Sequence, residues 1–144
     1  MSTPRPAPSG PHLIVALVTP FTEDRTLDRL SLTRLVAHLR AGGVHEFFVV
    51  GSTGEAPLLD ESDRLTIIET VRGAAPDGTI YAGVSGTGHR HAIRNARDAA
   101  RAGADIAVVM SPFFVALDQP QLVDFSTAIA DASPLPLALY HHLR

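Results

Sequence analysis

The sequence predicts an α/β protein built from parallel strand–helix units. Short apolar runs recur along the chain, each apolar at consecutive positions, as is typical of strands buried between two layers; they lie at 13–19, 46–51, 79–84, 105–110 and 135–140. Segments with helical spacing separate these runs. The strand cores begin near residues 14, 47, 80, 106 and 136. Each interval is about one strand–helix step, which favours a parallel sheet with right-handed crossovers.

The first unit passes from the run at 13–19 into a helix with a continuous apolar face. That face is formed at spacings of three and four residues by Leu32, Leu35, Val36 and Leu39. We predict Asp28 as the N-cap of this helix and Gly42 or Gly43 as its end.

The later helices follow the same logic. After Asp60, a candidate N-cap, a second helix is predicted from Leu65, Ile68 and Val71. The third has a face of small residues that suits close packing against a sheet and ends at Gly103; the face comprises Ala92, Ala96, Ala99 and Ala100. The fourth ends before Pro134, with an apolar face of Leu122, Phe125 and Ile129.

Five such strands fit two architectures, an open doubly wound sheet or part of a (β/α)8 barrel. The pattern leaves both open. A barrel takes about 250 residues, so these 144 residues are too few to close one by themselves. Residues 1–11 carry four prolines, and we expect them to form a disordered or polyproline-like leader ahead of a folded portion over 12–144.

Composition narrows the function classes. Hydrophobic residues make up 45% and charged residues 19% of the chain, as in globular proteins. A net charge of −3 argues against a nucleic-acid or anionic-membrane partner. The absence of cysteine excludes disulfides, thiolate zinc sites and cysteine nucleophiles. The seven histidines are scattered, so we expect no metal site, and the missing signal-peptide pattern leads us to expect a cytoplasmic protein.

The segment with the sharpest functional pattern is Gly51-Ser52-Thr53-Gly54-Glu55, which directly follows the second predicted strand. Ligands of parallel α/β proteins bind at the carboxyl ends of strands. The glycines permit a tight turn, and the Ser52 and Thr53 hydroxyls and backbone N–H groups are suited to an anion such as a carboxylate. The alternative is a glycine-rich turn whose Ser or Thr caps the next helix.

Three other strand ends carry candidates. Residues 83–88, GVSGTG, are predicted as a flexible loop lining a pocket. The aromatic residues of 111–114, SPFF, either wall an apolar pocket or pack against a neighbouring subunit. Tyr140 ends the fifth run and is either a core tyrosine or a phenol that relays protons or holds an oxyanion.

Together these segments resemble the dihydrodipicolinate synthase/N-acetylneuraminate lyase family. The matching motifs cover residues 12 to 140 and are VTPF (18–21), VGSTGE (50–55), GVSGTG (83–88), MSPFF (110–114) and LPLALY (135–140). The resemblance implies a partial TIM barrel, strands one to five of a (β/α)8 fold, and an assembly into homo-oligomers, dimers or tetramers.

The resemblance also implies an activity. Family members are carbon–carbon or carbon–oxygen lyases that form a Schiff base between a lysine and pyruvate or a related 2-oxo acid, without a further cofactor. It implies that Gly51, Ser52, Thr53 and Gly54 form the substrate-binding set, in which Ser52 and Thr53 bind the substrate carboxylate. It also makes Tyr140, as the proton shuttle, and Thr53 the catalytic candidates.

Three departures from the family pattern stand out. The 144 residues include no lysine, and arginine offers no neutral amine in its place, so we expect this chain to be inactive alone. Phe114 stands where the synthases have a tyrosine, which favours the lyase or sugar-acid aldolase branches. His141 and His142 replace the usual residues after Tyr140 and are candidates for contact with a substrate's polar tail.

Two further functions remain as alternatives. One is a non-catalytic truncated half-barrel that serves as an oligomerising or binding protein. The other is an unrelated open α/β domain that binds a small anion with its GSTGE turn. Because a half-barrel has two free sheet edges, we expect this chain to associate with itself.

Overall fold

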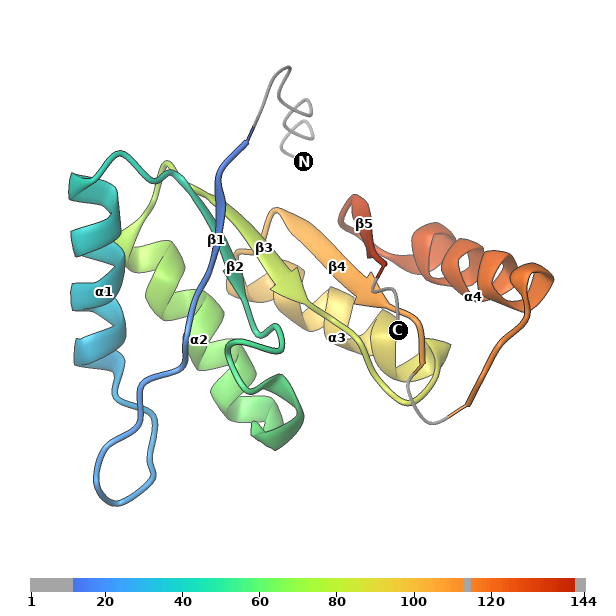
Figure 1. The fold of residues 1–144 in the computed structure, drawn as a ribbon, viewed down its shortest axis with the longest axis horizontal. Helices are drawn as coiled ribbons and strands as arrows, with labels where there is room; N and C mark the ends of the chain where they lie inside the picture. Colours follow the sequence, from blue (N-terminus) through green and yellow to red (C-terminus); the bar gives the residue numbers. More distant parts are fainter. Residues whose placement is uncertain (1–11, 113–114, 142–144) are drawn as a thin grey trace.

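The computed structural model describes residues 12–112 and 115–141. The expectations for the leader 1–11, for Phe113 and Phe114 and for His142 lie outside these residues. Strands and helices alternate along the chain (Figure 1): β1 (Ile14–Ala16), α1 (Arg29–Ala41), β2 (Glu46–Val49), a short 3-10 helix η1 (Ala56–Leu58), α2 (Glu61–Ala74), β3 (Thr79–Gly83), α3 (His89–Ala102), β4 (Ile106–Met110), α4 (Gln119–Ala132) and β5 (Leu137–Tyr140).

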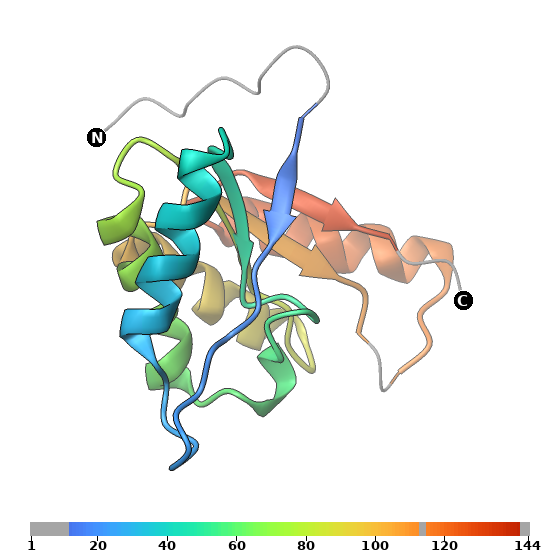
Figure 2. The ribbon, with the colours of Figure 1, turned by 60° about the vertical axis from the view of Figure 1, so that its left-hand side comes forward.

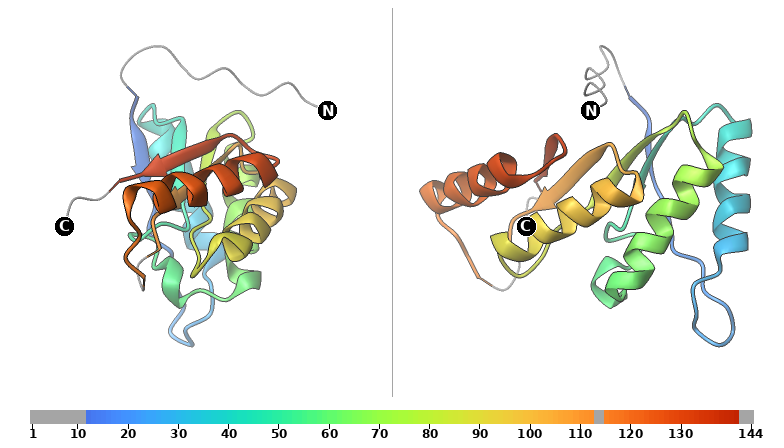
Figure 3. Two further views of the ribbon diagram at one scale, coloured as in Figure 1. Left: turned by 90° about the vertical axis from the view of Figure 1, so that its right-hand side faces the viewer. Right: turned by 180° about the vertical axis from the view of Figure 1, so that it is seen from behind.

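The sheet topology decides between the two predicted architectures. All neighbouring strands are parallel, and the strand order is the sequence order, β1-β2-β3-β4-β5. A doubly wound sheet reverses its strand order partway, whereas a barrel adds each strand beside the last. With right-handed crossovers, sequential order places all the helices on one side of the sheet, as the front and rear views show (Figures 1 and 3). The partial TIM barrel is therefore confirmed.

The hydrophobic core lies between the sheet and its helices. Phe47 of β2 and Ile80 of β3 are paired in register and fully buried on the helix side. Leu32 and Val36 of α1 and Ile129 of α4 are buried against the same layer. Among the described residues, no helix is both long and apolar enough to cross a bilayer.

Helix boundaries follow the predicted signals, with one exception. Asp28 accepts a hydrogen bond from the Ser31 N–H at 2.9 Å, and α1 ends at Gly42. Gly103 ends α3 with a φ of 99°, a left-handed conformation that glycine adopts without strain. Asp60 precedes α2 as predicted, but its side chain makes no capping hydrogen bond. The cap of α4, a reciprocal box between Asp118 and Gln121, was not predicted.

The two outer strands depart from the predicted pattern of burial. β1 has three residues instead of the expected run over 13–19, and its Ile14 is 42% exposed. Leu139 of β5 is 64% exposed. Figure 2 shows these strands at opposite edges of the curved sheet. Their apolar residues suit a strand with neighbours on both sides, but each has one neighbour within the described residues.

The inner face of the sheet, opposite the helices, carries a different set of side chains. Ala16, Phe48 and Tyr81 are aligned across β1, β2 and β3. Toward the amino ends of the strands, the Tyr81 hydroxyl donates to Glu46 Oε2 at 2.9 Å, and His12 Nδ1 lies 2.8 Å from Glu46 Oε1. Burial and the hydrogen bond to the Glu46 carboxylate raise the pKa of Tyr81 to about 12.

Candidate active site

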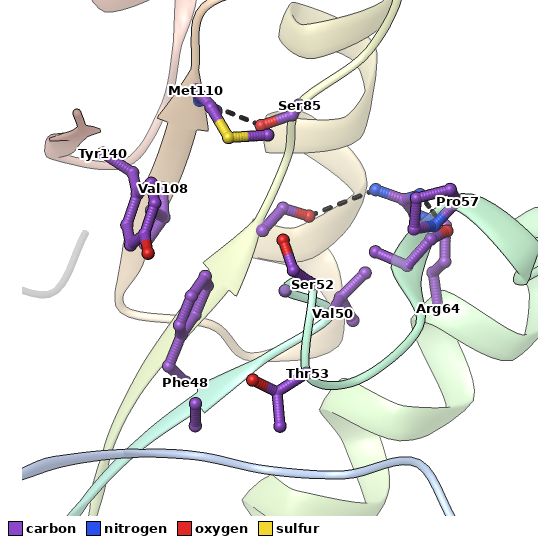
Figure 4. A pocket seen from close by; sticks show the side chains of 14 residues that line it. Phe48, Val50, Ser52, Thr53, Pro57, Arg64, Ser85, Val108, Met110 and Tyr140 are labelled. Carbon is purple, nitrogen blue, oxygen red and sulfur yellow. Dashed lines mark hydrogen bonds between the residues drawn. The ribbon is translucent and has the colours of Figure 1, made fainter. Parts of the chain in front are cut away.

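A pocket opens on the inner face at the carboxyl ends of β2 to β5. It encloses about 180 Å³, below the roughly 300–1,000 Å³ of pockets for drug-sized ligands, so it suits a molecule of a few heavy atoms. Figure 4 shows Phe48, Ser52, Thr53 and Tyr140 around the same hollow. The described residues that line it are Ala16, Phe48, Val50, Gly51, Ser52, Thr53, Ala56, Pro57, Arg64, Gly83, Ser85, Val108, Met110 and Tyr140.

A strained residue turns the chain into this pocket. Val50, just after β2, has a φ of 56°, a left-handed conformation that β-branched residues rarely adopt. This conformation brings the Val50 carbonyl against the backbone of β3 at Gly83, where a Cβ would lie 1.9 Å from the carbonyl oxygen. Gly83 therefore has to be glycine for the turn to sit here. Strain of this kind is often retained at functional sites.

The remaining glycines of the turn also lie in crowded positions. A Cβ at Gly51 would lie 2.7 Å from the Phe48 ring, and one at Gly54 would lie 3.1 Å from the Leu17 carbonyl oxygen. The buried Thr19 hydroxyl donates to the Gly54 carbonyl at 2.7 Å. Gly54 thus anchors the turn to the segment after β1. Gly51, Ser52 and Thr53 line the pocket, whereas Gly54 does not.

The hydrogen bonds within the turn do not use the backbone donors of Ser52 and Thr53. The N–H groups of Gly54 and Ala56 both donate to the Gly51 carbonyl, and that of Glu55 donates to the Ser52 carbonyl. Within the described residues, no hydrogen bond uses the backbone N–H of Ser52 or Thr53. Neither side chain caps η1, whose N-cap is Glu55. The helix-cap alternative is therefore wrong, and the available donors are those of the predicted anion site.

The candidate residues that follow β3 and end β5 line the same pocket. Tyr140 lines the pocket and is 48% exposed, so it is not a core tyrosine. It is paired in register with Met110, whose N–H donates to the Ser85 hydroxyl at 2.9 Å. Ser85 lies in the predicted pocket-lining loop and does line the pocket.

Among the described residues, no three potential ligand side chains gather around a possible metal position.

Arg64 is a pocket residue that was not predicted from the sequence. Among the described lining residues it is the one with a charged side chain. It lies in the first turn of α2, and its guanidinium donates to the carbonyls of Ala56 and Gly83, each at 3.2 Å. Arg64, Ile68 and Val71 share one helical face at spacings of four and three. Its place on the same helical face as the buried Ile68 and Val71 was the sequence signal that could have identified Arg64 as an inward-facing residue.

The fold and the site together define a class of protein, the (β/α)8-barrel type with a small pocket at the carboxyl ends of its strands. The family model described as the Dihydrodipicolinate synthetase family matches residues 10–142. The chain belongs to this family.

Two curated relatives in sequence are 4-hydroxy-tetrahydrodipicolinate synthases. The chain is 37% identical over 140 residues to 4-hydroxy-tetrahydrodipicolinate synthase 2 of Streptomyces coelicolor, covering 96% of this chain and 46% of that protein. It is 38% identical over 138 residues to the 4-hydroxy-tetrahydrodipicolinate synthase of a Synechococcus strain, covering 94% and 45%. The chain thus spans about half the length of the curated relatives that it matches.

Solved structures agree with this relationship. A dihydrodipicolinate synthase from Acinetobacter baumannii, complexed with pyruvate, superposes with a TM-score of 0.86 at 35% identity, over 90% of this chain and 45% of that one. YagE of E. coli K12, also in complex with pyruvate, gives a TM-score of 0.85 at 30% identity, over 91% and 44%.

Proposed function

We propose that this chain provides the substrate pocket of a lyase that acts on pyruvate or a related 2-oxo acid. The carboxylate binds to the Ser52 and Thr53 N–H groups and hydroxyls, with Gly51 and Gly54 shaping the turn. Tyr140 moves protons at the keto carbon, and Thr53 orients the reacting molecule. The observation that carries the proposal is that Ser52 and Thr53 are adjacent, line the pocket, and have backbone N–H groups with no hydrogen-bond partner among the described residues.

The chemistry of the family supports this assignment. A Schiff base between an amine and the keto carbon makes an electron sink, so that a carbon–carbon bond can form or break beside it. The proton transfers in such a sequence need a group at the keto carbon that both gives and takes a proton, as a tyrosine phenol can. Two related structures are described as complexes with pyruvate.

The second substrate separates two branches of this activity. The names of the relatives favour the synthase reaction. Phe114 has no hydroxyl where the synthases have a tyrosine, which favours the lyase or sugar-acid aldolase reactions. Both branches share the 2-oxo acid site proposed here.

Borohydride trapping tests the covalent part of the proposal. The 144 residues contain no lysine, and arginine stays protonated, so no side chain among them offers a neutral primary amine. We expect the chain, treated with pyruvate and borohydride, to show no reduced adduct on any side chain by peptide mass spectrometry. An adduct at a mapped side chain would contradict this, and the α-amino group serves as the internal control.

A second candidate function, association, rests on the exposed outer strands. Leu13 is 69% and Leu139 64% exposed, and they flank opposite edges of the sheet. Exposed parallel edges pair with other strands. We propose that the protein is a homo-oligomer, a dimer or tetramer, located in the cytoplasm. Light scattering is expected to give a mass above that of one chain, and a monodisperse monomer at all concentrations would refute the association.

A further inference from the structure

Arg64 sets the charge of the candidate pocket. The other described lining residues are apolar or neutral, and none is acidic. A lining with one positive charge and no negative charge makes the pocket attractive to an anion and unattractive to a cation. Figure 4 shows the Arg64 side chain reaching from α2 toward the turn, on the side of the hollow opposite Tyr140.

The surroundings of Arg64 neutralise little of this charge. No carboxylate among the described residues forms an ion pair with it. Glu61 is the acid whose charge acts on it, but that carboxylate is exposed and lies 3.8 Å from Arg94. Burial lowers the pKa of the Arg64 guanidinium, against the smaller opposing effect of Glu61. A desolvated cation without a carboxylate partner gains more from an arriving anion than a solvated one does.

The same side chain also fixes the shape of the site. Its two hydrogen bonds join the Ala56 carbonyl, which follows the turn, to the Gly83 carbonyl at the end of β3. Gly83 is the residue against which the Val50 carbonyl packs. The guanidinium therefore bridges the start of η1, directly after the turn, and the end of β3, against which the turn packs.

We propose that Arg64 is a specificity-determining and positioning residue, which makes this pocket select 2-oxo carboxylates over neutral carbonyl compounds of the same shape. The inference rests on the proposed function and adds to it the source of the selectivity. The backbone donors of the turn already bind a carboxylate more strongly than a neutral amide oxygen, and the guanidinium adds an attraction between full charges that only the carboxylate gains.

The experiment is a pair of titrations followed by NMR on the folded chain. Pyruvate and its neutral amide, pyruvamide, are each titrated into the wild type, Arg64→Gln and Arg97→Gln. We expect Arg64→Gln to weaken pyruvate binding by about tenfold and to change pyruvamide binding by less than about twofold. Arg97→Gln removes an exposed charge of α3 that does not line the pocket, so both affinities should match the wild type.

The outcomes separate the inference from the function on which it rests. Arg64→Gln with an unchanged preference for pyruvate would overturn the role of Arg64 and leave the site intact. Wild-type protein that binds pyruvate and pyruvamide equally well would overturn the selectivity alone, whereas wild-type protein with no saturable pyruvate binding would overturn the proposed function as well. If Arg64→Gln does not fold, the Arg64 Nε–H resonance of the wild type decides: pyruvate should shift it and pyruvamide should not, and a resonance unmoved by pyruvate would refute the proposal.

Discussion

Gly83→Ala is expected to destabilise the protein by roughly 2–3 kcal/mol, the upper part of the range for overpacking, and to abolish measurable pyruvate binding. The new Cβ would lie 1.9 Å from the Val50 carbonyl oxygen and 3.4 Å from the Gly51 nitrogen. Both neighbours are backbone atoms, so relief requires the turn itself to move. Urea unfolding measures the first effect and a pyruvate titration the second.

Gly73→Ala is the matched control for this substitution. Gly73 lies in α2, and a Cβ there would meet nothing within 4 Å. In an exposed helix interior, alanine is more favourable than glycine by about 0.8–1 kcal/mol, so this variant should gain stability and keep its pyruvate affinity. A Gly83→Ala protein as stable and as able to bind pyruvate as the wild type would contradict the structure of the turn.

Arg72→Met is expected to cost about 2–4 kcal/mol of stability, because it breaks a charged network and leaves its acceptors unpaired. Arg72 Nε donates to the Gly103 carbonyl at 2.9 Å, and its Nη1 donates to the Gly78 carbonyl at 2.9 Å. Its Nη2 forms an ion pair with Asp105, which also accepts from the Ile80 N–H at 2.8 Å. One side chain thus joins the end of α2 to the starts of β3 and β4.

This network lies at the end of the sheet opposite the pocket, so its loss should affect stability and leave binding in the folded protein unchanged. Arg97→Met provides the comparison, since Arg97 is exposed on α3 and surface substitutions usually stay within about 0.5 kcal/mol. Equal urea midpoints for the Arg72 and Arg97 variants would show that the network contributes nothing. Reduced pyruvate affinity in folded Arg72→Met would show that the two ends are coupled.

Much of the fold could be predicted because local signals and packing agree. The apolar faces of the helices, the Asp28 cap and the Gly103 end each specify a local structure that the core then uses. Strand order could not be read from apolar runs, since both predicted architectures bury their strands on two faces. The sequential order became evident in the pairing of the strands.

The candidate site was predictable in part, for a similar reason. A Gly-Ser-Thr-Gly turn after a strand places hydrogen-bond donors at the carboxyl end of that strand, and Tyr140 ends another strand of the same sheet. Because parallel strands have their carboxyl ends at the same edge, the turn and Tyr140 were expected to lie around one pocket, as they do. The left-handed Val50 gave no sequence signal, because valine rarely adopts this conformation. Arg64 was missed because its charge suggested the solvated face of α2, whereas its hydrogen bonds turn it inward.

The most direct test is a pyruvate titration of the wild-type chain followed through its backbone amide resonances. The turn is expected to give saturable shifts at Ser52 and Thr53, adjacent pocket-lining residues whose backbone N–H groups have no hydrogen-bond partner among the described residues. Resonances near Glu46 and Tyr81, at the amino ends of the strands, should not move. Saturable shifts at the amino ends, or no saturable shift at Ser52 and Thr53, would contradict the assignment of this pocket to a 2-oxo acid.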